Sequence, residues 1–211
     1  MTLKEQLAQG LNRLGIELPE NGFQRLLDYV SLLAKWNRVY NLTAIREPAR
    51  VVTHHLLDSL AVLPHINADT IADIGSGAGL PGIPLAVARP TSRVLLIESN
   101  HKKGAFLRQA VTELRLANVE VVTERVENWR PPCDVDVVIS RAFTDLAGFA
   151  EIAGHLCGPE GSLLAMKGIY PDEEIEQLPP EIKLDRVERI EVPGVRAARH
   201  LVIMRPRTSS Q

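Results

Sequence analysis

The chain has 211 residues, and its 24 lysines and arginines against 26 aspartates and glutamates give a formal net charge of −2. Hydrophobic residues make up 45 %, enough for the core of one globular domain, and the two cysteines exclude a disulfide framework. The near-neutral charge excludes binding to nucleic acid through a global positive field, so a nucleic-acid partner would have to meet a local basic patch. Because MTLKEQLAQG lacks the apolar core of a signal peptide and no run reaches 18 apolar residues, we expect a cytoplasmic protein that does not enter a membrane.

The N-terminal third of the chain carries a helical pattern. After Asn21, a candidate N-cap, apolar side chains recur with i, i+3, i+4 spacing at Phe23, Leu26, Leu27, Val30 and Leu33. A shorter helix is expected over residues 3–14. A third helix is expected from about Ala49 to Leu63, where Pro64 would stop it.

Beyond residue 69, short β-branched runs alternate with helical segments. Strands are expected at Thr70–Ile74, Arg93–Glu98, Val119–Thr123, Val135–Ser140 and Ser162–Lys167. Helices are expected at 81–88, 101–116, 144–157 and 171–177. Two last apolar runs flank the turn Pro193-Gly194 and predict a terminal hairpin, at Leu184–Val192 and His200–Met204. This order predicts an α/β, Rossmann-like fold with a mostly parallel seven-stranded sheet and an antiparallel terminal strand, over residues 66–206, on which helical residues 1–65 pack.

A glycine-rich loop follows the first expected strand, in TIADIGSGAGLPGIP. Glycine has no Cβ and tolerates positive φ, so such a loop lets backbone approach a ligand closely. Counted from Gly77, the loop fits the dinucleotide fingerprint G-x-G-x-x-G; taken from Asp73, the stretch DIGSGAG fits a loop that binds S-adenosylmethionine. The first glycine after the strand is Gly75, and from there the spacing is G-x-G-x-G, which favours S-adenosylmethionine.

Two acidic residues bear on the same choice. A carboxylate at the mouth of the loop, Asp73, would repel a pyrophosphate but not a sulfonium cation or an amino group. Glu98 ends the next strand, where a carboxylate can accept both hydroxyls of a ribose, or can simply be solvated. Gly75, Gly77 and Gly79 would admit the ligand to the backbone. The sequence therefore favours S-adenosylmethionine, without a metal, over a nicotinamide cofactor.

Several segments taken in order resemble a known family: WNRVYNLTAI, HHLLDSL, DIGSGAGLPGIP, SRAF and AMKG. Over most of its length the chain resembles the bacterial ribosomal RNA small subunit methyltransferase G family, also called glucose-inhibited division protein B. The resemblance implies a class I S-adenosylmethionine-dependent methyltransferase fold and methylation of 16S rRNA at N7 of one guanosine, guanosine 527 in that family. Ser76 and Ala78 stand where its members commonly carry threonine and proline.

The resemblance also implies site residues. Carried over by motif, the cofactor contacts fall at Gly75, Leu80, Val126, Glu127 and Arg141. Arg141 is expected to be the catalytic residue, beside the methyl donor, where it would meet the methionine carboxylate, a carboxylate of the protein or guanine O6. A purely structural ion pair is the alternative for this arginine.

The implied chemistry makes small demands on the protein. Guanine N7 carries a free lone pair, so positioning and desolvation suffice and no general base is needed. Cys133, in a Pro-Pro-Cys stretch typical of cytosine-C5 enzymes, precedes the fourth strand and lies at the wrong end of the sheet. His54, His55 and Asp58 lack a further ligand for a metal, so an orienting or capping role near the site is expected.

RNA is expected to contact the functional edge of the sheet through Lys102, Lys103 and Lys167. The expected partner is 16S rRNA, within a 30S subunit or an assembly intermediate, and the enzyme is expected to be a monomer. Phe143 could stack on a splayed base or belong to the core. Three other functions stay open on the residues alone: a small-molecule methyltransferase, an NAD-dependent oxidoreductase, and an RNA-binding module without activity.

Overall fold

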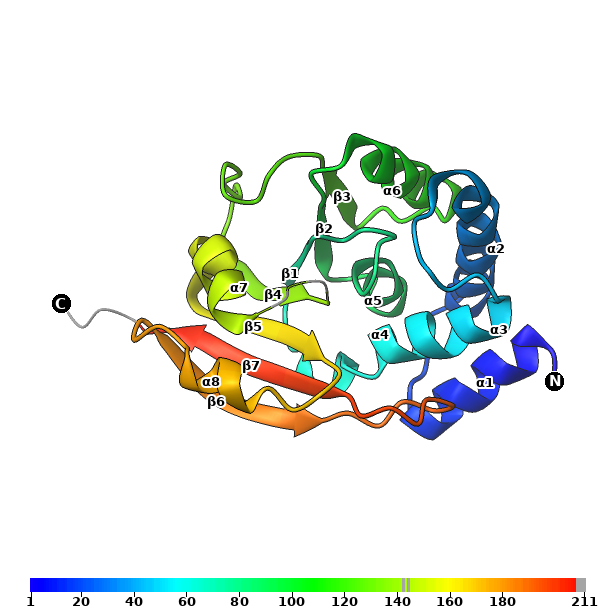
Figure 1. Ribbon diagram of the computed structural model, residues 1–211. Helices are drawn as coiled ribbons and strands as arrows, with labels where there is room; N and C mark the ends of the chain where they lie inside the picture. The colour runs from blue at the N-terminus through cyan, green and yellow to red at the C-terminus, as the bar shows by residue number, and fades with distance from the viewer. Residues whose placement is uncertain (142, 144, 208–211) are drawn as a thin grey trace.

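A computed structural model describes residues 1–141, 143 and 145–207 of the chain. Within these residues, seven strands form one sheet in the order β3-β2-β1-β4-β5-β7-β6 (Figure 1). Their bounds are β1 Thr70–Ile74, β2 Arg93–Ile97, β3 Val119–Val122, β4 Val135–Ser140, β5 Cys157–Lys167, β6 Ile182–Arg189 and β7 His200–Pro206. Strands β1 to β5 pair in parallel, whereas β7 lies antiparallel between β5 and β6. The predicted mostly parallel sheet with an antiparallel terminal strand is confirmed.

The strand order reverses at β1, and this point fixes where a ligand can bind. Ile71 of β1 pairs with Val94 of β2 on one side and with Val137 of β4 on the other. In open α/β sheets the crevice beyond the carboxyl ends of the strands, at such a reversal, holds the ligand. The loops that follow β1, β2 and β4 therefore converge on one edge of the sheet.

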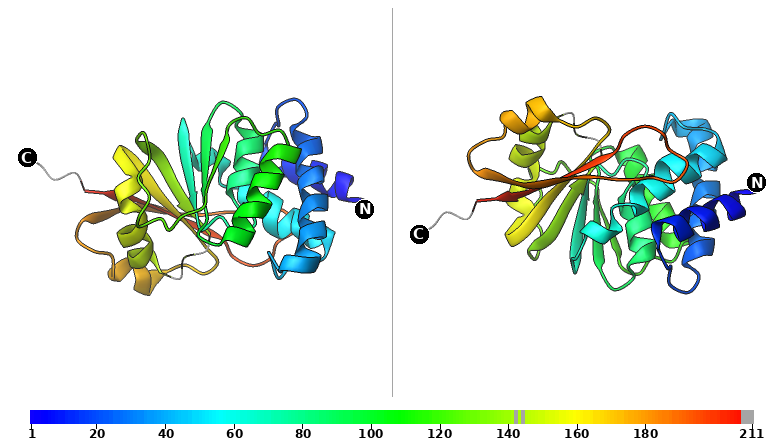
Figure 2. Two further views of the ribbon diagram at one scale, coloured as in Figure 1. Left: turned by 90° about the horizontal axis from the view of Figure 1, so that it is seen from above. Right: turned by 90° about the horizontal axis from the view of Figure 1, so that it is seen from below.

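Helices cover both faces of the sheet, giving three layers (Figures 1 and 2). The α-helices are α1 Leu3–Leu14, α2 Gly22–Tyr40, α3 Pro48–Val51, α4 Asp58–Leu60, α5 Gly82–Ala88, α6 His101–Glu113, α7 Leu146–Ala153 and α8 Asp172–Glu176. Helices α7 and α8 lie on one face; α5, α6 and the N-terminal helices lie on the other. Among the described residues, no helix is both long enough and apolar enough to cross a bilayer.

Two apolar cores fill the space between these layers. The larger core runs without interruption from Leu7 of α1 and Leu26 of α2 to Ile203 of β7. The smaller core lies under α7, around the fully buried Phe149. The N-terminal helices therefore share their apolar interior with the sheet, because their i, i+3, i+4 faces have no other surface to bury.

Three local expectations need correction. Asn21 holds the N-cap position of α2 with φ 62°, but its side chain makes no capping hydrogen bond. The helix expected over 49–63 is not one α-helix: α3 passes into the π-helix η1 (Val52–Leu57) and then α4. Pro64 lies inside a 3₁₀ turn, η2 (Leu63–His65), rather than ending an α-helix. A π segment holds one extra residue in a turn and is common at functional sites.

The C-terminal half differs from expectation mainly in its connections. The two hairpin strands are joined by residues 190–199, a longer connection than the Pro193-Gly194 turn alone. This connection borders a hollow together with the end of α1, and its Gly194 lies beside Thr53. Thr144, the expected start of the helix over 144–157, and Ala142 of the SRAF motif lie outside the described residues.

Candidate functional site

Most of the predicted site residues follow the carboxyl ends of neighbouring parallel strands. Gly75 follows β1, Glu98 follows β2, and Arg141 follows β4, while Lys167 is the last residue of β5. Val126 and Glu127 lie in the segment after β3. Strands β1 to β5 are parallel neighbours in the sheet, so their carboxyl ends, and the residues that follow them, lie at one edge.

The glycines of the loop after β1 have different reasons to be glycine. Gly75, Gly77 and Gly79 have φ of 66°, 58° and 84°, a region that favours glycine. A Cβ on Gly79 would lie 2.4 Å from Cδ1 of Ile83, so Gly79 is required by the packing of α5. A Cβ on Gly77 would meet only a backbone oxygen of the loop at 3.7 Å, so Gly77 faces space that a ligand can enter.

Backbone hydrogen bonds hold the side chain of Glu98 against this loop. Its side chain is largely buried, with 6 % of the residue exposed. Oε2 accepts a hydrogen bond from Gly77 N at 2.9 Å, and Oε1 accepts one from Asn100 N at 2.8 Å. A carboxylate has further lone pairs, so these bonds fix its position and still allow it to accept from a ligand. Its tie to the loop is a role that the sequence pattern did not suggest.

Asp73 does not lie at the open mouth of the loop, as the sequence suggested. It is completely buried, and its Oδ2 accepts a hydrogen bond from Gly82 N at 2.9 Å. Oδ1 has no hydrogen-bond partner among the described residues. Burial raises the pKa of this carboxyl to about 7, and the bond from Gly82 and the charge of Arg141 oppose the shift. The aspartate supports the loop from inside.

A hollow of about 300 Å³ opens beside the loop. Its walls come from the ends of β1 and β2, the segment after β3, and α7, and include Gly75, Val126 and Glu127. The structure thus brings three predicted cofactor residues together. Ser99, Phe143 and Ile152 also line it and were not predicted as cofactor contacts. Leu80 lies in the core instead, only 4 % exposed, so its side chain is not available to a ligand.

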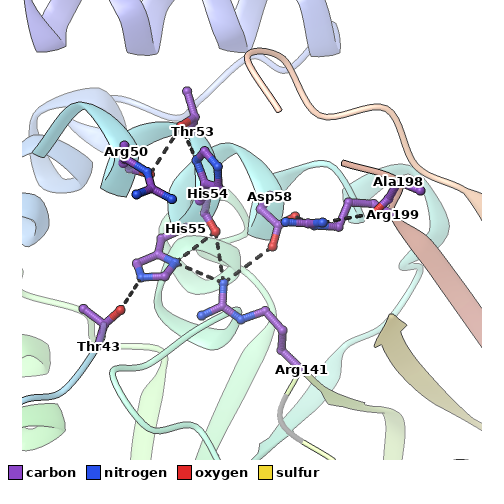
Figure 3. A network of polar contacts seen from close by, with 9 residues as sticks. All are labelled: Thr43, Arg50, Thr53, His54, His55, Asp58, Arg141, Ala198 and Arg199. Atoms are coloured by element: carbon purple, nitrogen blue, oxygen red, sulfur yellow. Dashed lines mark hydrogen bonds and ion pairs between the residues drawn. The ribbon is translucent and has the colours of Figure 1, made fainter. Parts of the chain in front are cut away.

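Arg141 reaches from the end of β4 to the N-terminal helices (Figure 3). Its Nη1 lies 3.4 Å from the carbonyl oxygen of His54 and 3.5 Å from Oδ2 of Asp58. Asp58 is buried and also binds Nε of Arg199 at 2.7 Å. One carboxylate thus faces two guanidinium groups, and it binds Arg199 more closely than Arg141. Asp58 and Arg199 are site residues whose pairing no local pattern could have revealed.

His55 completes this network as a neutral imidazole. Its Nδ1 lies 2.9 Å from the carbonyl oxygen of His54 and 3.3 Å from Nη1 of Arg141, and its Nε2 lies 2.7 Å from the hydroxyl of Thr43 (Figure 3). Burial, and after it the charge of Arg141, lowers the pKa of His55 to about 4. Among the described residues, no group of three or more His, Cys, Asp and Glu side chains is placed to hold a metal ion.

The three lysines predicted to contact RNA differ in their surroundings. Lys102 is exposed and Lys103 partly so, in the first turn of α6, where the Asn100 side chain caps their backbone N–H groups. Lys167 instead pairs with Glu174 at 2.7 Å, and its side chain is only 11 % exposed. Cys133 lies near Arg93, the first residue of β2, which places it at the opposite edge of the sheet.

The strand order, the glycine loop after the first strand and the acidic residue after the second together define a class I S-adenosylmethionine-dependent methyltransferase. The sequence model of the rRNA small subunit methyltransferase G family matches residues 23–202, and the chain belongs to this family. A ribosomal RNA small subunit methyltransferase G of Nitrosospira multiformis is 56 % identical over 207 residues, which cover 95 % of this chain and 96 % of that protein. Its counterpart in Laribacter hongkongensis is 52 % identical, over 96 % of this chain and 98 % of that protein.

Solved structures support the fold independently. A SAM-dependent methyltransferase of Aquifex aeolicus superposes with a TM-score of 0.54 at 20 % identity, over 75 % of this chain and 93 % of that one. TYW2 of M. jannaschii, in complex with AdoMet, gives a TM-score of 0.54 at 18 % identity, over 71 % of this chain and 74 % of that one. At such low identity these similarities concern the fold alone.

Proposed function

We propose that the chain methylates N7 of a guanosine in 16S rRNA, the position corresponding to guanosine 527 in its family. As a member of that family the chain is an S-adenosylmethionine-dependent rRNA methyltransferase. Family membership sets aside the oxidoreductase and small-molecule alternatives.

The observation that supports N7 is that the proton acceptors around Arg141, in the part of the chain that the structure describes, are already engaged. Both ring nitrogens of His55 are hydrogen-bonded, and its pKa of about 4 makes it a poor base. Asp58 faces two arginines. Neither His55 nor Asp58 is therefore free to act as a base, and the carboxyl of Asp73 is completely buried and out of reach of a substrate. A methyl acceptor that must first lose a proton is disfavoured here, whereas guanine N7 has a lone pair at neutral pH.

The residues present fit S-adenosylmethionine. The hollow beside Gly75 is open to a ligand, and Gly77 faces free space. When bound, this cofactor supplies an electrophilic methyl group on a sulfonium sulfur, which the N7 lone pair takes as the carbon–sulfur bond breaks. The protein's part is to hold the two reactants in line and exclude water.

The roles of the individual residues are part of the proposal. Val126 and Glu127 would border the adenine, Gly75 would let the backbone approach the methionine part and the ribose, and Glu98 would accept the ribose hydroxyls. Arg141 makes its contacts within the described residues through Nη1, so Nε and Nη2 can bind the methionine carboxylate or guanine O6. Because Asp58 binds Arg199 more closely, the charge of Arg141 is only partly compensated, which suits an anionic or electron-rich partner.

The RNA contacts, the oligomeric state and the cellular location of the enzyme are proposed as well. We expect Lys102 and Lys103 to contact phosphates of the RNA. Lys167 would act on the site mainly by holding Glu174. We further propose a cytoplasmic monomer whose residues 1–65 pack as an extension on residues 66–206, acting on a 30S subunit or an assembly intermediate.

The experiment is methyl transfer from radiolabelled S-adenosylmethionine to 30S subunits, and to deproteinised 16S rRNA, isolated from cells that lack the enzyme. The modified base is then mapped by borohydride and aniline cleavage, which is selective for 7-methylguanosine. We expect one cleavage site in 16S rRNA. Label incorporated without cleavage would overturn the assignment to N7, and label on free RNA alone would overturn the 30S substrate.

A further inference from the structure

A second hollow, of about 670 Å³, opens beside the first at the carboxyl edge of the sheet. It is bounded by Arg141 and Phe143 after β4, the end of β5, the loop after β5 and the start of α8. Phe143 lines both hollows. If the first hollow holds the methyl donor, a group in the second hollow is its neighbour, because both hollows border the same residue.

The loop after β5 exposes apolar side chains at the rim of this second hollow. Ile169 is 85 % exposed and Tyr170 45 % exposed. The Tyr170 ring meets the His200 ring edge to face, with centroids 5.4 Å apart, and His200 Nδ1 lies 3.3 Å from the Gly168 carbonyl oxygen. The tyrosine is thus held from one side while much of its surface remains available to a flat ligand.

The charges in the hollow argue against a phosphate as its occupant. Arg141 and Lys167 lie on one side, but the start of α8 adds the carboxylates of Asp172, Glu173 and Glu174. Lys167 is already paired with Glu174 at 2.7 Å. A phosphate would be repelled by the acidic wall. A neutral ring with hydrogen-bond acceptors on one edge and hydrogen-bond donors on another can face both the basic side chains and the carboxylates.

We propose that this second hollow seats the flipped-out target guanine, with Tyr170 as its stacking surface; this assignment rests on the proposed function. Guanine carries its acceptors N7 and O6 on one edge and its N1–H and N2–H₂ donors on another. With O6 toward Arg141, N7 faces the first hollow and the donors face the carboxylates. A base inside structured RNA reaches such a pocket only by leaving its stack, and an exposed aromatic ring replaces the stacking it loses.

The test compares Tyr170→Ala with a matched control, Tyr40→Ala. Tyr40 is equally exposed, at 46 %, but it ends α2, stacks on Trp36 and does not line the hollow. Single-turnover methylation of 30S subunits is measured against enzyme concentration. Stacking of one base on an aromatic ring is worth roughly 1–3 kcal/mol, so Tyr170→Ala should slow the saturated rate about 5- to 150-fold.

Further measurements distinguish stacking of Tyr170 on the target base from a general structural role of this residue. We expect Tyr170→Phe and Tyr170→Trp to retain most of the rate, because a flat ring and not the hydroxyl is required. S-adenosylmethionine affinity by calorimetry, and the enzyme concentration at half-saturation, should stay within about two-fold of wild type for Tyr170→Ala, since the phosphate contacts are untouched.

The outcomes distinguish this inference from the proposed function. If wild-type enzyme yields no 7-methylguanosine, the proposed function fails. If wild type yields it and Tyr170→Ala keeps the wild-type rate, the seat assigned to the base is wrong. Equal loss in Tyr40→Ala, or weakened cofactor binding in Tyr170→Ala, would likewise overturn it.

Discussion

Replacing Asp58 with asparagine tests whether the buried ion pairs hold the site together. Asp58 is 4 % exposed at its side chain, and its Oδ1 binds Nε of Arg199 at 2.7 Å. A hydrogen bond to a charged group contributes about 1.5–3 kcal/mol, and the longer contact to Arg141 adds at most about 1 kcal/mol. Asp58→Asn removes the charge and leaves two partly buried guanidinium groups without an anion. We therefore expect a loss of about 2–4 kcal/mol in the free energy of unfolding.

The matched control is the exposed pair of Arg93 and Glu120, which is equally short at 2.6 Å but has side chains 42 % and 50 % exposed. Solvent screens such a pair, so Glu120→Gln should leave stability and methyl transfer unchanged. Urea unfolding followed by tryptophan fluorescence measures both variants, with the m-value checked for constancy. Asp58→Asn should also slow methyl transfer, because Arg141 loses its anchor. Equal stability of the two variants would refute the argument from burial.

Three further outcomes follow from the loop and its support. Gly77→Val should abolish S-adenosylmethionine binding in calorimetry while the fold persists. Gly79→Val should lower the unfolding temperature more than Gly77→Val does, because both positions have positive φ but only the side chain at position 79 would collide with α5. Retained binding in Gly77→Val would remove this part of the loop from the site. Glu98→Ala should weaken cofactor binding at least about ten-fold. It should also loosen the loop, since the hydrogen bond from Gly77 N is lost. An effect on affinity below two-fold would contradict a ribose contact. The raised pKa of Asp73, about 7, means that the folded protein keeps a proton that the unfolded chain releases near pH 4. The contribution of Asp73 to the free energy of unfolding is therefore present at low pH and is lost as the pH rises to about 7. Asp73→Asn should be more stable than wild type at pH 8, by at most about 4 kcal/mol, but not at pH 4. Parallel profiles of unfolding free energy against pH for the two proteins would contradict this.

Local patterns in the sequence determined most of the scaffold. The bounds of β1 and β4 match the prediction, because each is a short β-branched run between breaking residues. The glycine loop, the acidic residue after β2 and the antiparallel end of the sheet could also be predicted, since each depends on residues close together in the chain. The family resemblance rests on such local motifs and is confirmed by near-full-length relatives.

Tertiary structure alone decided how the site is held. Asp58 and Arg199 are separated by 141 positions, and no period in the sequence relates them. The burial of Asp73 and the pairing of Lys167 with Glu174 also depend on which layers cover each strand end. The second hollow exists because the segment after β4 and the loop after β5 lie side by side. Such contacts are fixed by the order in which strands enter the sheet, so they carry no signal in a local stretch of residues.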